Sequence, residues 1–137
     1  LSRIDLEQFI VNQLNSNEME QLDQFRYMVT ESFSGRPLGT VDLYEIDWSR
    51  ESAYIGILVA DPNNRRKGIG RWALELLLKH LYEELAITTA FARIQPDNKA
   101  SQELFRKVGF KKKLEISSAQ KEDAEYIEFV CDLENKW

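Results

Sequence analysis

The fold is decided by residues 65–71, which read Arg-Arg-Lys-Gly-Ile-Gly-Arg. Before them lies Ala53–Ala60, an apolar run rich in β-branched residues that suits a central strand. After them comes the strongest helical pattern in the chain, because residues that can face a core recur at three-and-four spacing. These residues are Ile69, Trp72, Ala73, Leu76, Leu77, His80 and Leu81. A strand, a loop with two glycines and an amphipathic helix therefore form the centre of the predicted domain.

The loop has the composition of a phosphate site. Gly68 and Gly70 allow a close approach to a ligand, and the start of a helix offers unpaired N–H groups with a partial positive charge. Residues 62–74 hold four cations and no acid, although the whole chain has a formal charge of −5. For a lone Gly-x-Gly, a solvated turn is the competing interpretation. A Walker loop needs Gly-Lys-Ser/Thr, and a Rossmann site needs a third glycine where Ala73 stands, so neither nucleotide fingerprint fits.

The segments before this centre predict a helix and a hairpin. Helical spacing indicates an amphipathic helix over Ile4–Leu14. Alternation at Phe25, Tyr27 and Val29 indicates a strand, and Ser34–Pro37 has the residues of a turn. Leu38–Ile46 then forms the return strand, so three antiparallel strands precede the central loop.

The segments after the centre predict a strand, a helix and a closing strand pair. Thr88–Ile94 reads as a strand, and Asn98–Val108 reads as a helix that Gly109 stops at its C′ position. Phe110–Ile116 and Tyr126–Leu133 form the final strands. We expect one α/β (α+β) domain over residues 1–137, with a mixed, mostly antiparallel central sheet flanked by helices.

Composition narrows the class of protein. The 137 residues are 43% hydrophobic and 30% charged, with 6 Gly and 3 Pro, which is typical of one folded domain. The net negative charge argues against nucleic-acid and anionic-membrane partners. Cys131 has no partner for an internal disulfide, and His80 has none for a His-based zinc site, so no metal is expected. No apolar run approaches the roughly 20 residues of a membrane helix, and a cytoplasmic protein is expected.

The negative charge is unevenly distributed along the chain. Residues 1–61 carry a charge of −7, residues 62–114 carry +7, and residues 115–137 carry −5. The basic middle contains the glycine loop and the second helix. An anionic ligand is therefore expected at the centre of the sequence.

Two segments of the chain resemble the GNAT superfamily of N-acetyltransferases. The acetyl-CoA pyrophosphate loop of that family reads Arg/Gln-x-x-Gly-x-Gly/Ala, and residues 65–70 match it with Leu58–Pro62 before them. Asn98–Phe110 resembles the family's Asn-x-x-Ser/Ala-x-x-Leu-Tyr-x-Lys-x-Gly-Phe stretch. Two matches in the right order make a specific signal. Gly39–Leu43 and Ala53–Ile57 are most similar to the branch with ribosomal-protein N-terminal, spermidine and amino-sugar acetyltransferases.

The resemblance implies direct transfer of an acetyl group from acetyl-CoA, the co-substrate, to a primary amine, which can be cationic. The pantetheine arm would run beside the strand Ile57–Ala60, and residues 65–71 would hold the pyrophosphate. Asn98 and Ser101 would contact the arm, and the Phe105 ring would lie near the sulfur. The acetyl-CoA residues implied are Leu58, Val59, Arg65, Arg66, Lys67, Gly68, Ile69, Gly70, Arg71, Asn98, Ser101 and Phe105. Asn98 also suits a helix cap, and Phe105 also suits a core position.

The two usual acid/base positions of the family differ in this chain. Many relatives carry Tyr where Phe105 stands, and its hydroxyl can protonate the departing thiolate. Many also carry a Glu base where Tyr54 stands, and a tyrosine with a pKa near 10 is a poor base at neutral pH. Tyr54 and Glu45 are the candidate catalytic residues. Simple alternation places Asp42, Tyr44 and Ile46 on one face of the strand, and Val41, Leu43 and Glu45 on the other.

Alternatives to an enzyme remain open at this level. A non-catalytic acyl-CoA-binding or regulatory domain of the same fold is motivated by Phe105 and Tyr54. A nucleic-acid module that uses residues 65–71 is disfavoured by the net charge. A homodimer is compatible with the sequence. Relatives usually begin with a strand and a helix before the segment seen at Leu1, so this chain is expected to lack them.

Overall fold

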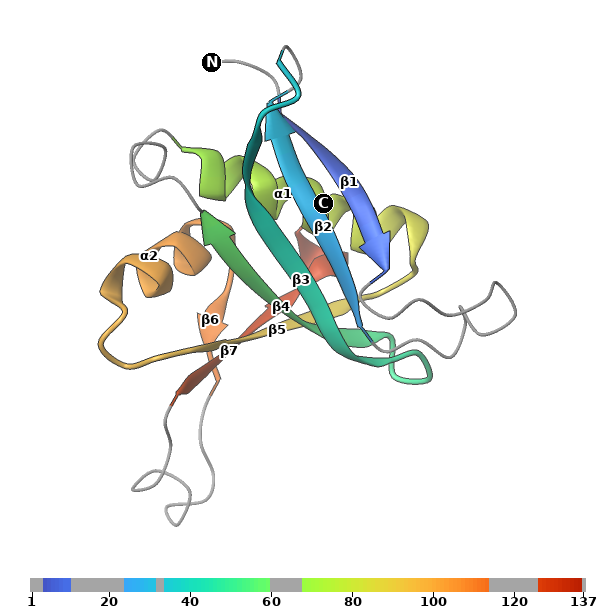
Figure 1. The fold of residues 1–137 in the computed structure, drawn as a ribbon. Coiled ribbons are helices and arrows are strands. Elements are labelled where there is room, and N and C mark those ends of the chain that lie inside the picture. Colours follow the sequence, from blue (N-terminus) through green and yellow to red (C-terminus); the bar gives the residue numbers. More distant parts are fainter. Residues whose placement is uncertain (1–3, 11–23, 32–33, 60–67, 114–125, 137) are drawn as a thin grey trace.

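The protein is described by a computed structural model that covers residues 4–10, 24–31, 34–59, 68–113 and 126–136 (Figure 1). Its elements follow one another as β1 (Ile4–Ile10), β2 (Phe25–Glu31), β3 (Pro37–Asp47), β4 (Ser52–Val59), α1 (Ile69–Glu84), β5 (Thr89–Ile94), α2 (Lys99–Lys107), β6 (Lys111–Lys112), β7 (Ile127–Asp132) and a 3₁₀ turn (Leu133–Asn135). The seven strands form one sheet in the order β1-β2-β3-β4-β5-β7-β6. Only β4 and β5 run parallel among these neighbours, which confirms the predicted mixed, mostly antiparallel sheet.

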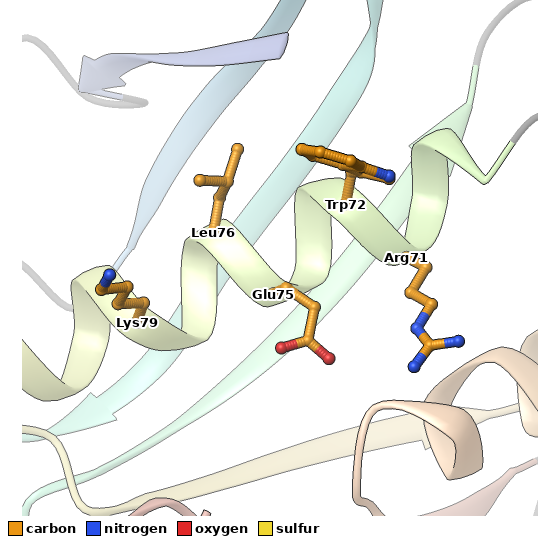
Figure 2. A pocket seen from close by; sticks show the side chains of 5 residues that line it. All are labelled: Arg71, Trp72, Glu75, Leu76 and Lys79. Atoms are coloured by element: carbon orange, nitrogen blue, oxygen red, sulfur yellow. The ribbon is translucent and has the colours of Figure 1, made fainter. Parts of the chain in front are cut away.

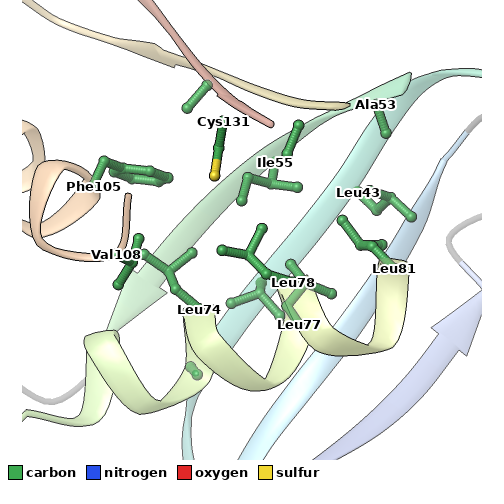
Figure 3. Close-up of a cluster of buried hydrophobic side chains, with 14 of the residues drawn as sticks. Leu43, Ala53, Ile55, Leu74, Leu77, Leu78, Leu81, Phe105, Val108 and Cys131 are labelled. Carbon is green, nitrogen blue, oxygen red and sulfur yellow. The ribbon is translucent and has the colours of Figure 1, made fainter. Parts of the chain in front are cut away.

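The core lies between α1 and one face of the sheet. The inward face of α1 is apolar, and Ile69, Ala73, Leu77 and Leu81 of the predicted set are buried in it. The prediction is wrong at the other three positions: Trp72 is 47% exposed, Leu76 and His80 are half-buried, and Leu74 and Leu78 are buried in their place. Alternate residues of β3, β4 and β5 meet it, so each strand has one buried and one more open face. Figure 3 shows this cluster, with Leu74, Leu77, Leu78 and Leu81 of α1 facing Leu43, Ala53 and Ile55 of the strands.

The second helix begins and ends where the sequence predicts. The Asn98 side chain accepts a hydrogen bond from the backbone N–H of Ser101 at 3.1 Å, which caps the first turn of α2. Gly109 has a φ of +108° and donates its N–H to the carbonyl of Arg106. The next residue, Phe110, donates to the carbonyl of Phe105 at 2.9 Å, so the last carbonyls of the helix are paired.

The predicted helix over Ile4–Leu14 is wrong where the structure describes it. Ile4–Ile10 is a strand that pairs antiparallel with β2, from Ile4 opposite Glu31 to Ile10 opposite Phe25. Ile4, Leu6 and Ile10 also fit an alternating pattern, so the apolar spacing suited both structures. Pairing with β2, which lies far away in the sequence, decides between them. Residues 11–14 lie outside the described residues.

The predicted division of faces on β3 is wrong at Glu45 and Ile46. Glu45 has a φ of +48°, and the pairing of β3 with β4 shifts register between Tyr44 and Asp47. This β-bulge adds a residue, so the alternation of side chains changes phase. Ile46 therefore enters the core at 8% exposure, and Glu45 leaves the face of Val41 and Leu43 and is exposed.

Neither helix in the described part of the chain is long and apolar enough to cross a membrane.

Candidate functional site

The sheet opens between its two parallel strands. β4 and β5 pair only at Ser52–Thr89, Ala53–Ala90 and Tyr54–Phe91, although β4 continues to Val59 and β5 to Ile94. Beyond Tyr54 the two strands diverge, as Figure 1 shows. On its other side β4 stays paired with β3 as far as Val59. We call the opening beyond the Tyr54–Phe91 pair the fork. At the fork, the β5-facing edge of β4 has no strand partner among the described residues.

The first turn of α1 follows the far end of β4. Gly68 has a φ of +76°, in the left-handed region that glycine tolerates, and no side chain in the described part of the chain caps this helix. The first turn contains no acidic residue, so its partial positive charge is not offset there. Such a helix start presents backbone donors and a favourable field to an anion.

Gly70 has a packing role in this turn. A Cβ atom at this position would lie 3.1 Å from Cδ2 of Leu104 in α2 and 3.8 Å from Cδ1 of Ile57 in β4. The glycine therefore lets the start of α1 lie close against α2 and the fork side of β4. Ile69 is buried beside it, so it serves the core.

Arg71 lies on the outer face of α1. It lines an open pocket of about 500 Å³ with four other residues of this helix, Trp72, Glu75, Leu76 and Lys79 (Figure 2). All five come from α1, and none of the residues at the fork line this pocket. Arg71 is the one member that the sequence assigned to CoA.

The predicted contacts of the pantetheine arm divide between surface and core. Asn98 is exposed and Ser101 is half-buried, both at the start of α2. Phe105 is 2% exposed and packs edge-to-face against Phe110, with ring centroids 5.0 Å apart. Figure 3 shows Phe105 among core side chains, near Cys131 and Val108. The core role considered for Phe105 is confirmed, and its contact with the CoA sulfur stays a prediction.

The remaining predicted CoA residues are described only in part. Leu58 and Val59 belong to β4, and their side chains lie outside the described part of the structure. Arg65, Arg66 and Lys67 lie outside the described residues. Their roles stay predictions.

An aromatic row crosses three strands at the base of the fork. Tyr54 stacks on Tyr44 of β3, with ring centroids 5.7 Å apart, and on Phe91 of β5 at 5.1 Å. The guanidinium carbon of Arg93 lies 3.9 Å from the centroid of the Tyr54 ring. The Tyr54 hydroxyl donates a short hydrogen bond to the Glu128 carboxylate of β7. The ring and the hydroxyl of Tyr54 are therefore both fixed.

The β-bulge brings the second candidate to the same place. Arg93 donates two hydrogen bonds to the Glu45 carboxylate, at 3.0 and 2.7 Å. The hydrogen bonds to Glu45 raise the pKa of Arg93 above its ordinary value, although burial acts to lower it. Simple alternation would have put Glu45 with the core side chains. The structure instead brings Glu45 and Tyr54 together around Arg93.

At the base of the fork, the Tyr54 phenol is protonated and the Glu128 carboxyl is ionised. Burial, with the hydrogen bond to Glu128, raises the pKa of Tyr54 to about 12, so its hydroxyl keeps its proton at neutral pH. Burial also acts to raise the pKa of Glu128. The hydrogen bonds from Tyr54 and Lys113 outweigh it, and the pKa falls below its ordinary value. Tyr54 therefore keeps its proton at neutral pH and donates a hydrogen bond to an ionised Glu128.

Sequence reasoning missed Arg93, Lys113 and Glu128. The signal available was alternation in the last strand, where Phe129 and Cys131 are buried and Glu128 faces the other side. Alternation gives a face but no strand partner, so it cannot bring Glu128 to Tyr54.

Cys131 and His80 both have packing roles in the structure. Cys131 is buried in the core, and this burial raises the pKa of its thiol. His80 is half-buried and meets the Tyr27 ring edge-to-face at 5.4 Å. Burial lowers the pKa of His80, which fits a packing role.

Comparison with known proteins identifies the family to which this sequence is similar. The sequence model of the acetyltransferase (GNAT) domain matches residues 1–111. An N-acetyltransferase 9-like protein of Caenorhabditis briggsae is 33% identical over 95 residues, which cover 65% of this chain and 48% of that protein. This chain covers 30 to 48% of the lengths of three N-acetyltransferase 9-like relatives that it matches.

Two solved structures from Vibrio cholerae share the fold. Spermidine N-acetyltransferase in complex with CoA and spermine superposes with a TM-score of 0.70 and 17% identity, covering 88% of this chain and 72% of that one. A ribosomal-protein-serine acetyltransferase structure gives a TM-score of 0.68 and 21% identity, covering 85% and 68%.

Proposed function

Because the chain belongs to the GNAT acetyltransferase family, we propose that it transfers the acetyl group of acetyl-CoA directly to a primary amine. The observation that carries this proposal is the fork. The edge of β4 beyond Tyr54 has no strand partner among the residues that the structure describes, and its backbone donors and acceptors can bind an extended amide-containing arm as they would a neighbouring strand. The pantetheine arm of CoA is such a chain.

The start of α1 supports the placement of the CoA pyrophosphate at residues 65–71. Gly68 and Gly70 belong to a helix start that follows the far end of β4 and that no side chain of the described residues caps. An anion there meets the backbone N–H groups of the first turn. We assign Arg65, Arg66, Lys67 and Arg71 to the same phosphates through their charge.

The start of α2 supports the placement of the arm. The side-chain oxygen of Asn98 caps the helix. The nitrogen of the same side-chain amide is a hydrogen-bond donor that a ligand can use. We assign Asn98 and Ser101 to the pantetheine arm, with Leu58 and Val59 contributing backbone groups from β4. Phe105 supports this surface from the core beneath it.

The acceptor is proposed as a primary amine. Spermine is bound in the spermidine N-acetyltransferase structure, and a ribosomal-protein-serine acetyltransferase shares the fold, so both a polyamine and a protein N-terminus are acceptors to test. We place the reaction in the cytoplasm and propose neither a nucleic-acid nor a membrane partner. A homodimer stays a prediction.

The test measures binding and chemistry separately. Titration calorimetry with CoA reports the co-substrate site, and release of free thiol from acetyl-CoA reports turnover across spermine, amino sugars and a peptide with a free N-terminal serine. The proposal expects CoA binding and saturable turnover with at least one amine. CoA binding without acetylation of any amine would instead indicate the non-catalytic acyl-CoA-binding alternative. No CoA binding at millimolar concentration would overturn the proposal.

A further inference from the structure

The Tyr54 hydroxyl is fixed more firmly than packing of a half-exposed tyrosine requires. Its ring is held between Tyr44 and Phe91, with the Arg93 guanidinium over one face. Its hydroxyl proton is committed to Glu128. A phenol oxygen that donates its proton still has lone pairs, so it is oriented to accept a hydrogen bond from another donor.

The Tyr54 hydroxyl donates to Glu128, a charged group with Lys113 and Arg93 beside it. The side chain of Glu128 is 15% exposed, and its other oxygen lies 3.1 Å from the ammonium of Lys113. Arg93 is the further charged group that acts on it, from β5, where it is itself paired with Glu45. Glu128 therefore stays a carboxylate, and the hydroxyl hydrogen of Tyr54 stays directed toward it.

Tyr54 lies at the point where the sheet opens. Tyr54 and Phe91 form the last pair before β4 and β5 diverge. The proposed function places the thioester in the fork that opens at this pair, and the inference below rests on that placement. We propose that the Tyr54 hydroxyl accepts an N–H hydrogen bond from the attacking amine, and that Glu128 is the positioning residue that orients this hydroxyl.

The chemical step then proceeds without a base from this pair. The lone pair of the free amine forms the N–C bond to the thioester carbonyl carbon. The C–S bond breaks with its electron pair on sulfur, and the surplus proton of the nitrogen passes to the departing thiolate. Positive charge develops on nitrogen during the attack, so its N–H becomes a stronger donor to the Tyr54 oxygen in the transition state.

A purely structural role predicts something different. In that case the Tyr54–Glu128 hydrogen bond only joins β4 to β7 across β5, and its loss would lower stability without a specific kinetic effect. The two roles differ in how the residues combine. If Glu128 acts through Tyr54, removal of its charge matters only while the Tyr54 hydroxyl is present.

The experiment compares four proteins with the fastest amine of the panel: wild type, Tyr54→Phe, Glu128→Gln and the double variant. Tyr54→Phe is expected to lower kcat about tenfold, the effect of one charge-strengthened hydrogen bond, with KM for the amine changed less than about twofold. Glu128→Gln is expected to lower kcat about threefold, because glutamine keeps an acceptor but loses the charge. In the Tyr54→Phe background, Glu128→Gln is expected to add nothing.

Two matched variants control for nonspecific damage. Tyr44→Phe removes a hydroxyl from the neighbouring ring of the same row. Glu75→Gln breaks a second carboxylate–lysine pair, with Lys136 at 3.3 Å, on α1. Both should keep wild-type kcat, and circular dichroism with CoA calorimetry establishes that every variant is folded.

The pH profile of kcat/KM provides the second readout. The rising limb should follow deprotonation of the acceptor amine and stay in place in Tyr54→Phe and Glu128→Gln. A displaced limb in either variant would make the pair a base and contradict the inference. Unchanged kcat in Tyr54→Phe, or equal effects of Glu128→Gln in both backgrounds, would also contradict it. Absence of wild-type turnover with every amine would refute the proposed function itself, and this inference with it.

Discussion

Tyr54 of β4 and Phe91 of β5 are paired residues whose rings stack with centroids 5.1 Å apart, and they are the last pair before these strands separate. Beyond this pair, β4 stays paired with β3, and β5 stays paired with β7. The aromatic pair therefore marks the point where the sheet opens. The starts of α1 and α2 both follow strands that lead away from this point (Figure 1).

The Gly68→Asp substitution is expected to abolish CoA binding. Gly68 precedes the first residue of α1, and a carboxylate there would repel the pyrophosphate and cap the helix N–H groups that we assign to it. Calorimetry with CoA measures the loss.

Gly35→Asp is the matched control for this change. Gly35 has a φ of +72°, close to the +76° of Gly68, and lies in the turn between β2 and β3 with nothing near its missing Cβ. The backbone strain and the added charge are therefore the same, and CoA affinity should be unchanged. Wild-type affinity in Gly68→Asp would contradict the placement of the pyrophosphate.

Two substitutions of Asn98 separate its cap from its proposed contact with CoA. Serine retains a capping oxygen, so Asn98→Ser should keep the stability of α2 and still weaken CoA binding through loss of the amide donor. Asn98→Ala should weaken binding and also cost about 1 kcal/mol of unfolding free energy. Urea denaturation and calorimetry measure the two effects. Full CoA affinity in Asn98→Ser would leave only the capping role.

Tyrosine-to-phenylalanine changes should have opposite effects at two positions. The Tyr27 hydroxyl is buried and has no hydrogen-bond partner among the described residues, so Tyr27→Phe should keep or increase stability. The Tyr54 hydroxyl is bonded to Glu128, so Tyr54→Phe should cost about 1 kcal/mol. Chemical denaturation compares them. A large loss in Tyr27→Phe would indicate a partner for that hydroxyl.

Acid should remove part of the stability through Glu128. The pKa of its carboxyl is lowered from 4.5 in the folded chain, so the unfolded chain binds the proton more readily. The contribution is complete above pH 4.5 and is lost as pH falls through the lower folded value. Unfolding free energy measured from pH 6 to pH 3 should fall less steeply in Glu128→Gln than in wild type. Equal slopes would contradict the pKa direction.

Local patterns predicted the elements that local interactions decide. The spacing of α1, the Asn98 cap and the Gly109 stop of α2 each depend on residues within a few positions of one another. The first strand was predicted as a helix because Ile4–Ile10 fits both periods, and its pairing with β2 is a long-range contact. Long-range pairing is not visible in a short window of sequence.

The fork chemistry was predicted only in part for the same reason. Tyr54 and Glu45 were named from the sequence, but the bulge that turns Glu45 toward Arg93 depends on a backbone φ of +48° at a residue with no glycine signal. Glu128 lies 74 positions from Tyr54, and only the strand order β4-β5-β7 brings them together.

The central claim is tested most directly by detecting the acetylated amine by mass spectrometry while thiol release from acetyl-CoA is followed. Wild type and Gly35→Asp should form product and thiol in equal amounts with at least one amine of the panel, and Gly68→Asp should form neither. Tight CoA binding by wild type with no acetylated amine would contradict the account and leave a CoA-binding domain without transfer activity.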